Sequence, residues 1–203
     1  MKHIWLITWT LIMPILFNPG LEMSWMNKGN QPERVKDILV LSVAGNADST
    51  AAISMESEVA NELRSYNYRT ESAIAHFGNN AFSKIREEET IKQLYPYDAV
   101  IILSLVNENQ RHAQVSECND FFWEYYDSKY SAAHNSHTSK ANNYFWELSF
   151  FEISSWKLKY RMKTFSVPSS QVEIMACGFG KLITKEMLDK NIIHPLPDNL
   201  KAF

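Results

Sequence analysis

A six-residue apolar run, Ile38-Leu39-Val40-Leu41-Ser42-Val43, constrains the fold of this chain more than any other feature. It follows the charged segment 33–37 and ends at residues 44–49, which are rich in turn and helix-cap residue types. A short run of this kind without polar alternation predicts a strand that is buried on both faces. Such strands lie at the centre of α/β sheets, so we expect the rest of the chain to pack around it.

Residues 49–65 predict a helix that begins directly after this strand. Apolar side chains recur there at helical spacing, and Asp48 or Ser49 can accept hydrogen bonds from the first-turn amides. Glu56 and most of the other polar side chains fall outside the apolar stripe. We therefore expect the polar side chains Glu56, Asn61, Glu62 and Arg64 to lie mostly outside the core.

Two more strands and a second helix follow in alternation. A weakly patterned strand is expected at 69–75 and a helix at 84–94, which Pro96 ends. Residues 98–106 are almost entirely apolar and predict a second buried strand. This order indicates β-α-β crossovers and locally parallel pairing.

The last third of the chain predicts a β-hairpin with one face on the core, because apolar side chains alternate on both sides of residues 154–156. A three-residue loop at 154–156 sets the pairing of the two strands. On the core side it pairs Leu148 with Met162 and Phe150 with Tyr160. On the other side it pairs Glu147 with Lys163, Ser149 with Arg161 and Phe151 with Lys159. That other side carries four cations and predicts a solvent-facing basic stripe, formed by Lys157, Lys159, Arg161 and Lys163. Such a stripe could bind an anionic partner weakly.

A final helix is expected after Pro168 and continues to about Lys190. Ser170 and Glu173 have the spacing of a capping box. Gly178 and Gly180 lie inside this helix, where they would allow close packing rather than form a nucleotide-binding loop. Residues 194–203 form a tail.

These patterns predict a single α/β domain over residues 23–193. We expect a mixed sheet of about five strands, arranged as βαβαβ followed by a hairpin and a C-terminal helix, with helices packed on the sheet. Residues 23–37 are expected to form a polar N-terminal segment, the lead-in, that lies over the surface of this domain. The chain has 203 residues and a net charge of −3, so nothing in its overall charge indicates nucleic-acid binding.

The N-terminus has the pattern of a signal peptide, which we place at residues 1–22. Lys2 and His3 precede a fourteen-residue apolar stretch that ends at Asn18-Pro19-Gly20. A bilayer span takes roughly 20 residues, so this stretch is short for a membrane helix, although an uncleaved anchor is the alternative. The pattern predicts an exported, periplasmic or envelope-associated protein with no membrane span in the mature chain.

Export would permit a disulfide bond between Cys118 and Cys177, although two cysteines so far apart in sequence are more often unpaired.

Residues 107–143 are polar, lack a clean period and are rich in aromatic side chains. They predict a long excursion between two strands, and long loops in compact domains are often functional or mobile. The alternative is that the rings only pack the excursion onto the sheet edge.

Candidate chemistry is sparse. The excursion could assemble a metal site from His112, Cys118, Asp127, His134 and His137, but histidines in a polar loop are more often exposed to solvent. The loop 44–48 could present amides to an anion, although it lacks the glycine density of a phosphate loop. The sequence assigns no catalytic, cofactor-binding or metal-binding residue and no cofactor.

The chain resembles an uncharacterised family of bacterial envelope proteins, often lipoproteins, whose α/β fold is similar to the N-terminal domain of TolB-type periplasmic proteins. The resemblance covers about residues 24–193. It rests on Ser24-Trp25, Pro32, the Lys-x-Ile-Leu-Val-Leu strand, Glu56, Leu63, the Asp-Ala-Val-Ile-Ile strand, the hairpin and Pro168-Ser169-Ser170. The family's lipobox Cys is absent, and Trp156 stands in the hairpin turn where Gly is common. The family implies no catalytic role.

Two function classes follow. The favoured one is a non-catalytic exported module that binds an envelope protein or an anionic cell-envelope component. The alternative is an exported hydrolase with its site under the 107–143 excursion. A large pocket that holds Asp, Glu or His with perturbed titration would favour the enzyme, and an aromatic surface beside a free sheet edge would favour the binding module.

Overall fold

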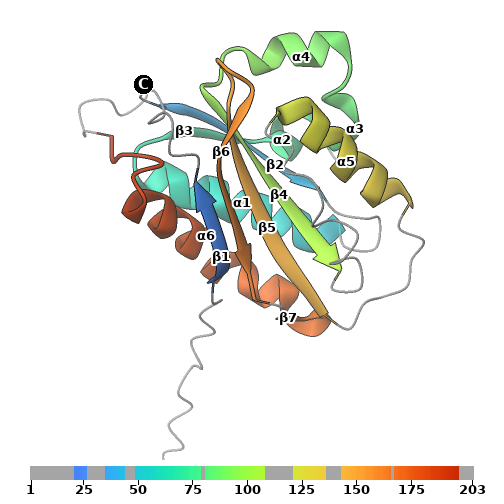
Figure 1. The fold of residues 1–203 in the computed structure, drawn as a ribbon, viewed down its shortest axis with the longest axis vertical. Helices are drawn as coiled ribbons and strands as arrows, with labels where there is room; N and C mark the ends of the chain where they lie inside the picture. Colours follow the sequence, from blue (N-terminus) through green and yellow to red (C-terminus); the bar gives the residue numbers. More distant parts are fainter. Residues whose placement is uncertain are drawn as a thin grey trace, which may run out of the picture.

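The apolar run Ile38–Val43 lies in β2, Asp37–Val43, which is an interior strand of a seven-stranded sheet. Figure 1 shows this sheet in a computed structural model, which describes residues 21–26, 35–43, 49–78, 81–107, 121–135, 143–165 and 167–196. The other strands are β1 Leu21–Met26, β3 Arg69–Ser72, β4 Ala99–Asn107, β5 Asn143–Glu152, β6 Lys157–Thr164 and β7 Val167–Pro168.

The sheet is mixed, as the sequence predicts. Its strand order is β1-β6-β5-β4-β2-β3, and the short β7 pairs with β5. β2 is parallel to both of its neighbours, β3 and β4, whereas β4, β5, β6 and β1 pair antiparallel. The prediction of a single α/β domain with parallel β-α-β crossovers is confirmed, and the structure adds β1 and β7 to the five expected strands.

Helices cover both faces of the sheet (Figure 1). They are α1 Ser49–Ser65, α2 Ala73–Phe77, α3 Ala81–Lys84, α4 Glu88–Leu94, α5 Phe122–Asn135, the 3-10 helix η3 Ser169–Gln171 and α6 Val172–Asp189. α1 and α6 pack side by side on one face, where Ile38 and Val40 of β2 contribute to the core. Leu39 and Leu41 belong to a second core, which contains residues of α2, α3, α4 and α5. The apolar run lacks polar alternation because both of its faces are buried.

Two predicted elements differ in extent in the structure. The strand expected at 69–75 ends at Ser72, whose side chain caps α2 by accepting a hydrogen bond from the Ala75 amide at 3.3 Å. The helix expected at 84–94 is divided into α3 and α4, since residues 85–87 form turns and bends.

β1 and α5 are the longest of the elements that were not predicted. Residues 21–26 form β1, which pairs with β6 at one edge of the sheet, although residues 21 and 22 were assigned to the signal peptide and the rest to the lead-in. Residues 122–135 of the excursion form α5, whose Phe122, Tyr125 and Tyr126 are buried against the sheet. Aromatic side chains have modest helix propensity, so tertiary packing rather than local preference stabilises this helix.

The hairpin register is confirmed from Glu147–Lys163 to Phe150–Tyr160. The prediction fails nearer the turn: the register shifts after Phe150, Phe151 pairs with Leu158 instead of Lys159, and residues 153–156 form the turn. A β-bulge leaves one residue of the longer strand without an opposite partner, and here that residue is Lys159.

The predicted solvent-facing basic stripe is wrong. Lys159 and Lys163 are buried, and their ammonium groups lie 3.0 Å from Glu152 Oε2 and 3.4 Å from Glu22 Oε2. The Arg161 guanidinium lies over the Tyr125 ring. Of the four cations, Lys157 alone is exposed. This face of the sheet is not open to solvent, because α5, which was not predicted, packs on it.

The final helix begins later than expected, and Ser170 does not occupy its N-cap position. Gln171 occupies the N-cap position of α6 and makes no side-chain cap hydrogen bond. The close-packing role predicted for the glycines is confirmed for Gly180, where a Cβ atom would lie 3.1 Å from the Glu58 carbonyl oxygen of α1. Among the described residues, none of the helices has the length and apolarity needed to cross a bilayer.

Candidate functional site

Two adjoining cavities lie at the end of the sheet where the parallel strands β2, β3 and β4 begin. One has a volume of about 570 Å³ and the other about 420 Å³. We call them the β3 cavity and the turn cavity. The ring of Tyr97 lines both.

The segment Tyr95-Pro96-Tyr97-Asp98 carries α4 into β4 and forms the shared wall. The Tyr97 amide donates to the Leu94 carbonyl at 3.0 Å as α4 ends, and the Asp98 amide donates to the Asp37 carbonyl at 2.9 Å. The Asp98 carboxylate in turn accepts hydrogen bonds from the backbone amides of Lys36 at 2.7 Å and Asp37 at 3.0 Å. Asp98 therefore fixes the start of β2 beside the start of β4.

The hairpin turn forms the opposite wall of the turn cavity. The Ile153 amide donates to the Asp98 carbonyl at 2.9 Å, which joins the turn to the Tyr95–Asp98 segment. Trp156 has a φ of 54°, a conformation rarely adopted by a bulky residue. Its ring packs against those of Phe122 and Trp123, and the Tyr95 ring meets it edge-on at a centroid distance of 6.4 Å.

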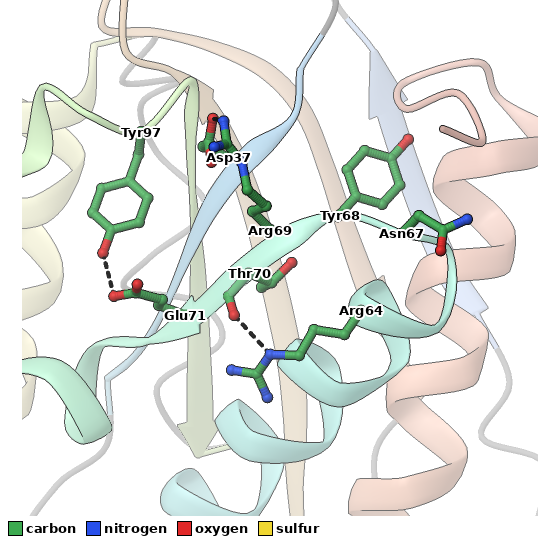
Figure 2. A pocket seen from close by; sticks show the side chains of 8 residues that line it. All are labelled: Asp37, Arg64, Asn67, Tyr68, Arg69, Thr70, Glu71 and Tyr97. Atoms are coloured by element: carbon green, nitrogen blue, oxygen red, sulfur yellow. Dashed lines mark hydrogen bonds and ion pairs between the residues drawn. The ribbon is translucent and has the colours of Figure 1, made fainter. Parts of the chain in front are cut away.

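The β3 cavity is lined mainly by paired polar groups (Figure 2). Its lining residues are Asp37, Arg64, Asn67, Tyr68, Arg69, Thr70, Glu71 and Tyr97. The Tyr97 hydroxyl donates to Glu71 Oε2 at 2.6 Å, and Arg69 forms an ion pair with Asp37. Arg64 Nε donates to the Thr70 carbonyl at 2.8 Å, so this edge strand has one backbone acceptor occupied by a side chain of its own protein.

The turn cavity has a different lining. It consists of Val35, Tyr95, Tyr97, Asp98, Glu152, Ile153, Ser154 and Trp156. Of these described lining residues, three side chains are aromatic, two are carboxylates, and none is a lysine or arginine. Glu152 Oε2 accepts a hydrogen bond from Ser155 Oγ at 2.6 Å and forms the ion pair with Lys159.

Burial shifts the pKa values of three groups that line the β3 cavity. Burial raises the pKa of Tyr97 well above its usual value, and the negative charge of Glu71 adds to this effect. Burial raises the pKa of Tyr68 to about 12. Burial also raises the pKa of Asp37, although the neighbouring Arg69 opposes the change. The phenols therefore stay neutral and can act as hydrogen-bond donors rather than as general bases.

A second group of polar side chains lies beneath α5. Lys129 Nζ and the Tyr125 hydroxyl both contact Glu147 Oε1, at 3.0 Å and 2.8 Å. Lys129 and Tyr125 are buried. These groups hold α5 on the sheet and are bonded to one another.

A third polar group lies on the α1 side of the sheet, around the fully buried Glu56. Its Oε2 accepts from the Ser42 amide and hydroxyl at 2.7 and 2.6 Å. Its Oε1 accepts from the Ser72 hydroxyl at 2.6 Å and the Ile74 amide at 2.7 Å. The expectation that Glu56 lies outside the core is wrong. Position 56 is four residues from both Ala52 and Ala60, and this spacing could have indicated its burial.

Most of the metal-site candidates lie outside the described part of the chain. His112, Cys118 and His137 lie outside the described residues, as does the loop 44–48, and the side chain of His134 is not described. Asp127 lies on α5 and forms an ion pair with Arg86. The described part of the chain contains no group of three or more His, Cys, Asp or Glu side chains that could hold a metal ion. The Cys118–Cys177 pairing also involves residues outside this description and stays a prediction.

The residues that form the cavities carry no recognisable motif in the sequence. Tyr95, Tyr97 and Asp98 surround a helix-ending proline, and that alone indicates only a connection between two elements. Trp156 was noted for its place in the turn. Its proximity to Tyr95 depends on the antiparallel pairing of β4 with β5, which a single sequence does not show.

Comparison with known proteins assigns no family. No family model and no curated protein matches the chain. Two solved structures that match are PelC dodecamers from Paraburkholderia phytofirmans, one of them a single-residue variant. The variant is 14% identical, with 85% of this chain and 99% of that chain covered and a TM-score of 0.42. The other is 15% identical, with 85% and 98% covered and a TM-score of 0.42.

The resemblance to TolB-type envelope proteins is therefore wrong, since these matching structures are PelC and no family model supports it. The quoted motifs are buried strands, a hairpin and helix starts. Many α/β domains need those features, so they do not distinguish one family from another.

Proposed function

We propose that the protein is an exported, non-catalytic binding module of the bacterial cell envelope, and that the β3 cavity and the turn cavity form its binding surface. The observation that carries this proposal is the presence of two adjoining cavities with aromatic walls whose charged groups are largely paired with one another. Concave, partly aromatic surfaces with a few fixed polar groups are the usual form of binding sites.

An anionic partner at the hairpin is no longer favoured. That part of the expectation rested on four free cations, and Lys159 and Lys163 are buried beside carboxylates. The proposed partner is therefore an envelope component that contacts the cavities rather than the hairpin face.

The alternative of a hydrolase beneath α5 receives less support. Glu147, Lys129 and Tyr125 do lie there, but they bond to one another and help to attach α5 to the sheet. A catalytic acid or base has to reach a substrate, and these contacts leave the three groups engaged within the protein.

Binding can be tested by sedimentation of the purified mature protein with isolated cell envelopes. Tyr95 is 63% exposed on the wall of the turn cavity, so Tyr95→Ala should remove a contact surface and leave the fold intact. Ile174 is 72% exposed near the start of α6, and Ile174→Ala is the matched control. We expect wild type and the control to sediment with the envelopes and Tyr95→Ala to remain largely in solution. Equal sedimentation of all three proteins would contradict the proposal.

Export is tested separately by the intact mass of the protein from its native source. β1 begins at Leu21 and pairs with β6, so cleavage that preserves this strand must occur at or before residue 20. A mass that corresponds to loss of about the first 20 residues is expected, and a full-length mass would favour an anchor.

A further inference from the structure

The turn cavity combines aromatic faces with negative charge. Tyr95, Tyr97 and Trp156 contribute the rings, Asp98 and Glu152 contribute the carboxylates, and the described lining residues include no cationic side chain. The face of an aromatic ring attracts cations, and the attraction grows when the cation is shielded from water. Anions would meet two carboxylates in this cavity, so its chemistry selects against them.

The two carboxylates differ in how their charge is balanced. Glu152 has the Lys159 ammonium at 3.0 Å. Asp98 accepts hydrogen bonds from the Lys36 and Asp37 amides and, within the part of the chain that the structure describes, forms no ion pair. Within the described ranges, one carboxylate on the cavity wall is thus balanced by a lysine, and the other has neutral donors as its partners. The cavity can accept one positive charge.

The rings are held by contacts outside the cavity. Trp156 packs against Phe122 and Trp123 of α5, and the Tyr97 hydroxyl is tied to Glu71. Tyr95 is the exposed member and meets Trp156 edge-on. Two fixed rings and one exposed ring form a preorganised wall with an open side, which lowers the entropic cost of binding.

We propose that the turn cavity binds an organic ammonium cation, which the rings of Tyr95, Tyr97 and Trp156 surround and the Asp98 carboxylate balances. This inference rests on the proposed function and names the chemical class that the binding surface recognises. The ammonium group could belong to a small quaternary ammonium compound or to a lysine side chain of a protein, and the test separates these sources.

The test compares choline with 3,3-dimethyl-1-butanol, a neutral molecule of the same shape, by NMR titration of the mature protein. We expect choline to shift the backbone amide signals of residues 95–98 and 153–156, and the neutral molecule to bind at least about fivefold more weakly. Nα-acetyl-lysine methylamide is titrated in parallel. Tighter binding of the lysine compound would assign the ammonium group to a protein partner, and tighter binding of choline to a small molecule. Equal binding of choline and the neutral molecule, or no binding of either ammonium compound, would overturn the proposal.

Two variants test the residues. Asp98→Asn keeps an oxygen that can accept from the Lys36 and Asp37 amides but removes the charge, and it should weaken choline binding about tenfold. Tyr95→Ala should weaken it about fivefold, and Ile174→Ala should leave it unchanged. If Asp98→Asn does not fold, Tyr95→Ala decides the outcome because its exposed ring is dispensable for folding. Unchanged choline binding in Tyr95→Ala would contradict the proposal.

The two proposals can fail independently. Envelope sedimentation that depends on Tyr95, together with no choline binding, would keep the binding module and reject the ammonium ligand. Choline binding that depends on Tyr95, without envelope sedimentation, would keep the ligand class and reject the envelope partner.

Discussion

Glu56 and Glu147 are two glutamates in the interior of one domain, and their environments differ in kind. Four hydrogen bonds from neutral donors surround Glu56, whereas Glu147 has the Lys129 ammonium and the Tyr125 hydroxyl beside it. Burial raises the pKa of Glu56, and its hydrogen bonds only partly oppose that effect. Burial would also raise the pKa of Glu147, but the positive charges of Lys129 and Arg161 outweigh it and hold this pKa below its usual value.

The two glutamates also join different parts of the fold. Glu56 links α1 to the end of β2 and to the junction of β3 with α2. Glu147 links β5 to α5, the helix that covers the other face of the sheet. Neutral donors can hold a buried carboxylate within a compact βαβ unit, whereas a helix that packs over a sheet is attached here through an ion pair. The comparison predicts different responses to mutation and to pH.

The largest effect is expected when Lys129 is replaced. Lys129→Met preserves most of the volume of the side chain but leaves the Glu147 carboxylate without its nearest cation. Removal of one partner from a buried ion pair costs about 3–5 kcal/mol. We expect the free energy of unfolding, measured by urea denaturation, to fall by that amount, with lower values if Arg161 compensates.

A double variant controls for lost packing. Lys129→Met combined with Glu147→Leu removes both charges, so most of the lost stability should return. A double variant as unstable as Lys129→Met alone would show that the lysine acts through packing rather than through charge.

Glu56→Gln should have the next largest effect, about 2–3 kcal/mol of lost stability. Each carboxylate oxygen of Glu56 accepts from a backbone amide, Ser42 on one side and Ile74 on the other. A glutamine amide has only one oxygen, so in either orientation its NH₂ group faces an amide donor. Glu62→Gln, on the same helix but less buried, is the control and should change urea stability by less than about 0.5 kcal/mol. Equal loss in both variants would contradict this account.

Tyr125→Phe tests the neutral donor within the ion-pair group. It removes the hydroxyl that donates to Glu147 at 2.8 Å and keeps the ring beneath Lys129 and Arg161. A hydrogen bond to a charged acceptor contributes about 1.5–3 kcal/mol, and the Lys129 pair that remains should limit the loss to about 1–2 kcal/mol. Tyr95→Phe, at an exposed position, should leave the thermal melting temperature unchanged. A loss in Tyr125→Phe as small as that in Tyr95→Phe would contradict a stabilising role for the hydroxyl.

The sequence predicted the parts of the fold that depend on local pattern. β2, α1 and β4 were predicted because their apolar residues recur without interruption or at helical spacing. The hairpin register was predicted as far as Phe150, since a slip would bring its apolar side chains to the wrong face. α5 and β1 were missed because each is stabilised by contacts with β5 or β6, far away in the sequence.

The candidate site was missed for the same physical reason. Its walls come from the segment that follows α4 and from the hairpin turn, and they meet only when β4 pairs with β5. Neither segment has a motif by itself. The burial of Glu56 could have been predicted, because its spacing from Ala52 and Ala60 is visible in the sequence. Glu56 was instead grouped with the polar side chains of the helix.

The smallest expected effect is the pH dependence, and here the two glutamates should respond in opposite directions. The pKa of Glu56 is raised in the folded state, so the native protein binds this proton more tightly than the unfolded chain does. Its contribution to stability is fully present below the usual glutamate pKa of about 4.5 and is lost as pH rises through the folded value. The pKa of Glu147 is lowered, so its contribution is present above about 4.5 and is lost as pH falls.

The direction of each pH dependence can be measured as the difference in the free energy of unfolding between wild type and a single variant. Urea stability is compared from pH 3.5 to 7.5 for wild type, Glu56→Gln and Glu147→Gln. Because wild type alone carries the titrating Glu56, the stability difference from Glu56→Gln should shrink as pH rises above about 4.5. The difference from Glu147→Gln should instead grow as pH rises toward about 4.5 and stay level above it. If both differences change with the same sign, the two glutamates do not titrate in the separate environments that the hydrogen bonds and the Lys129 ion pair create.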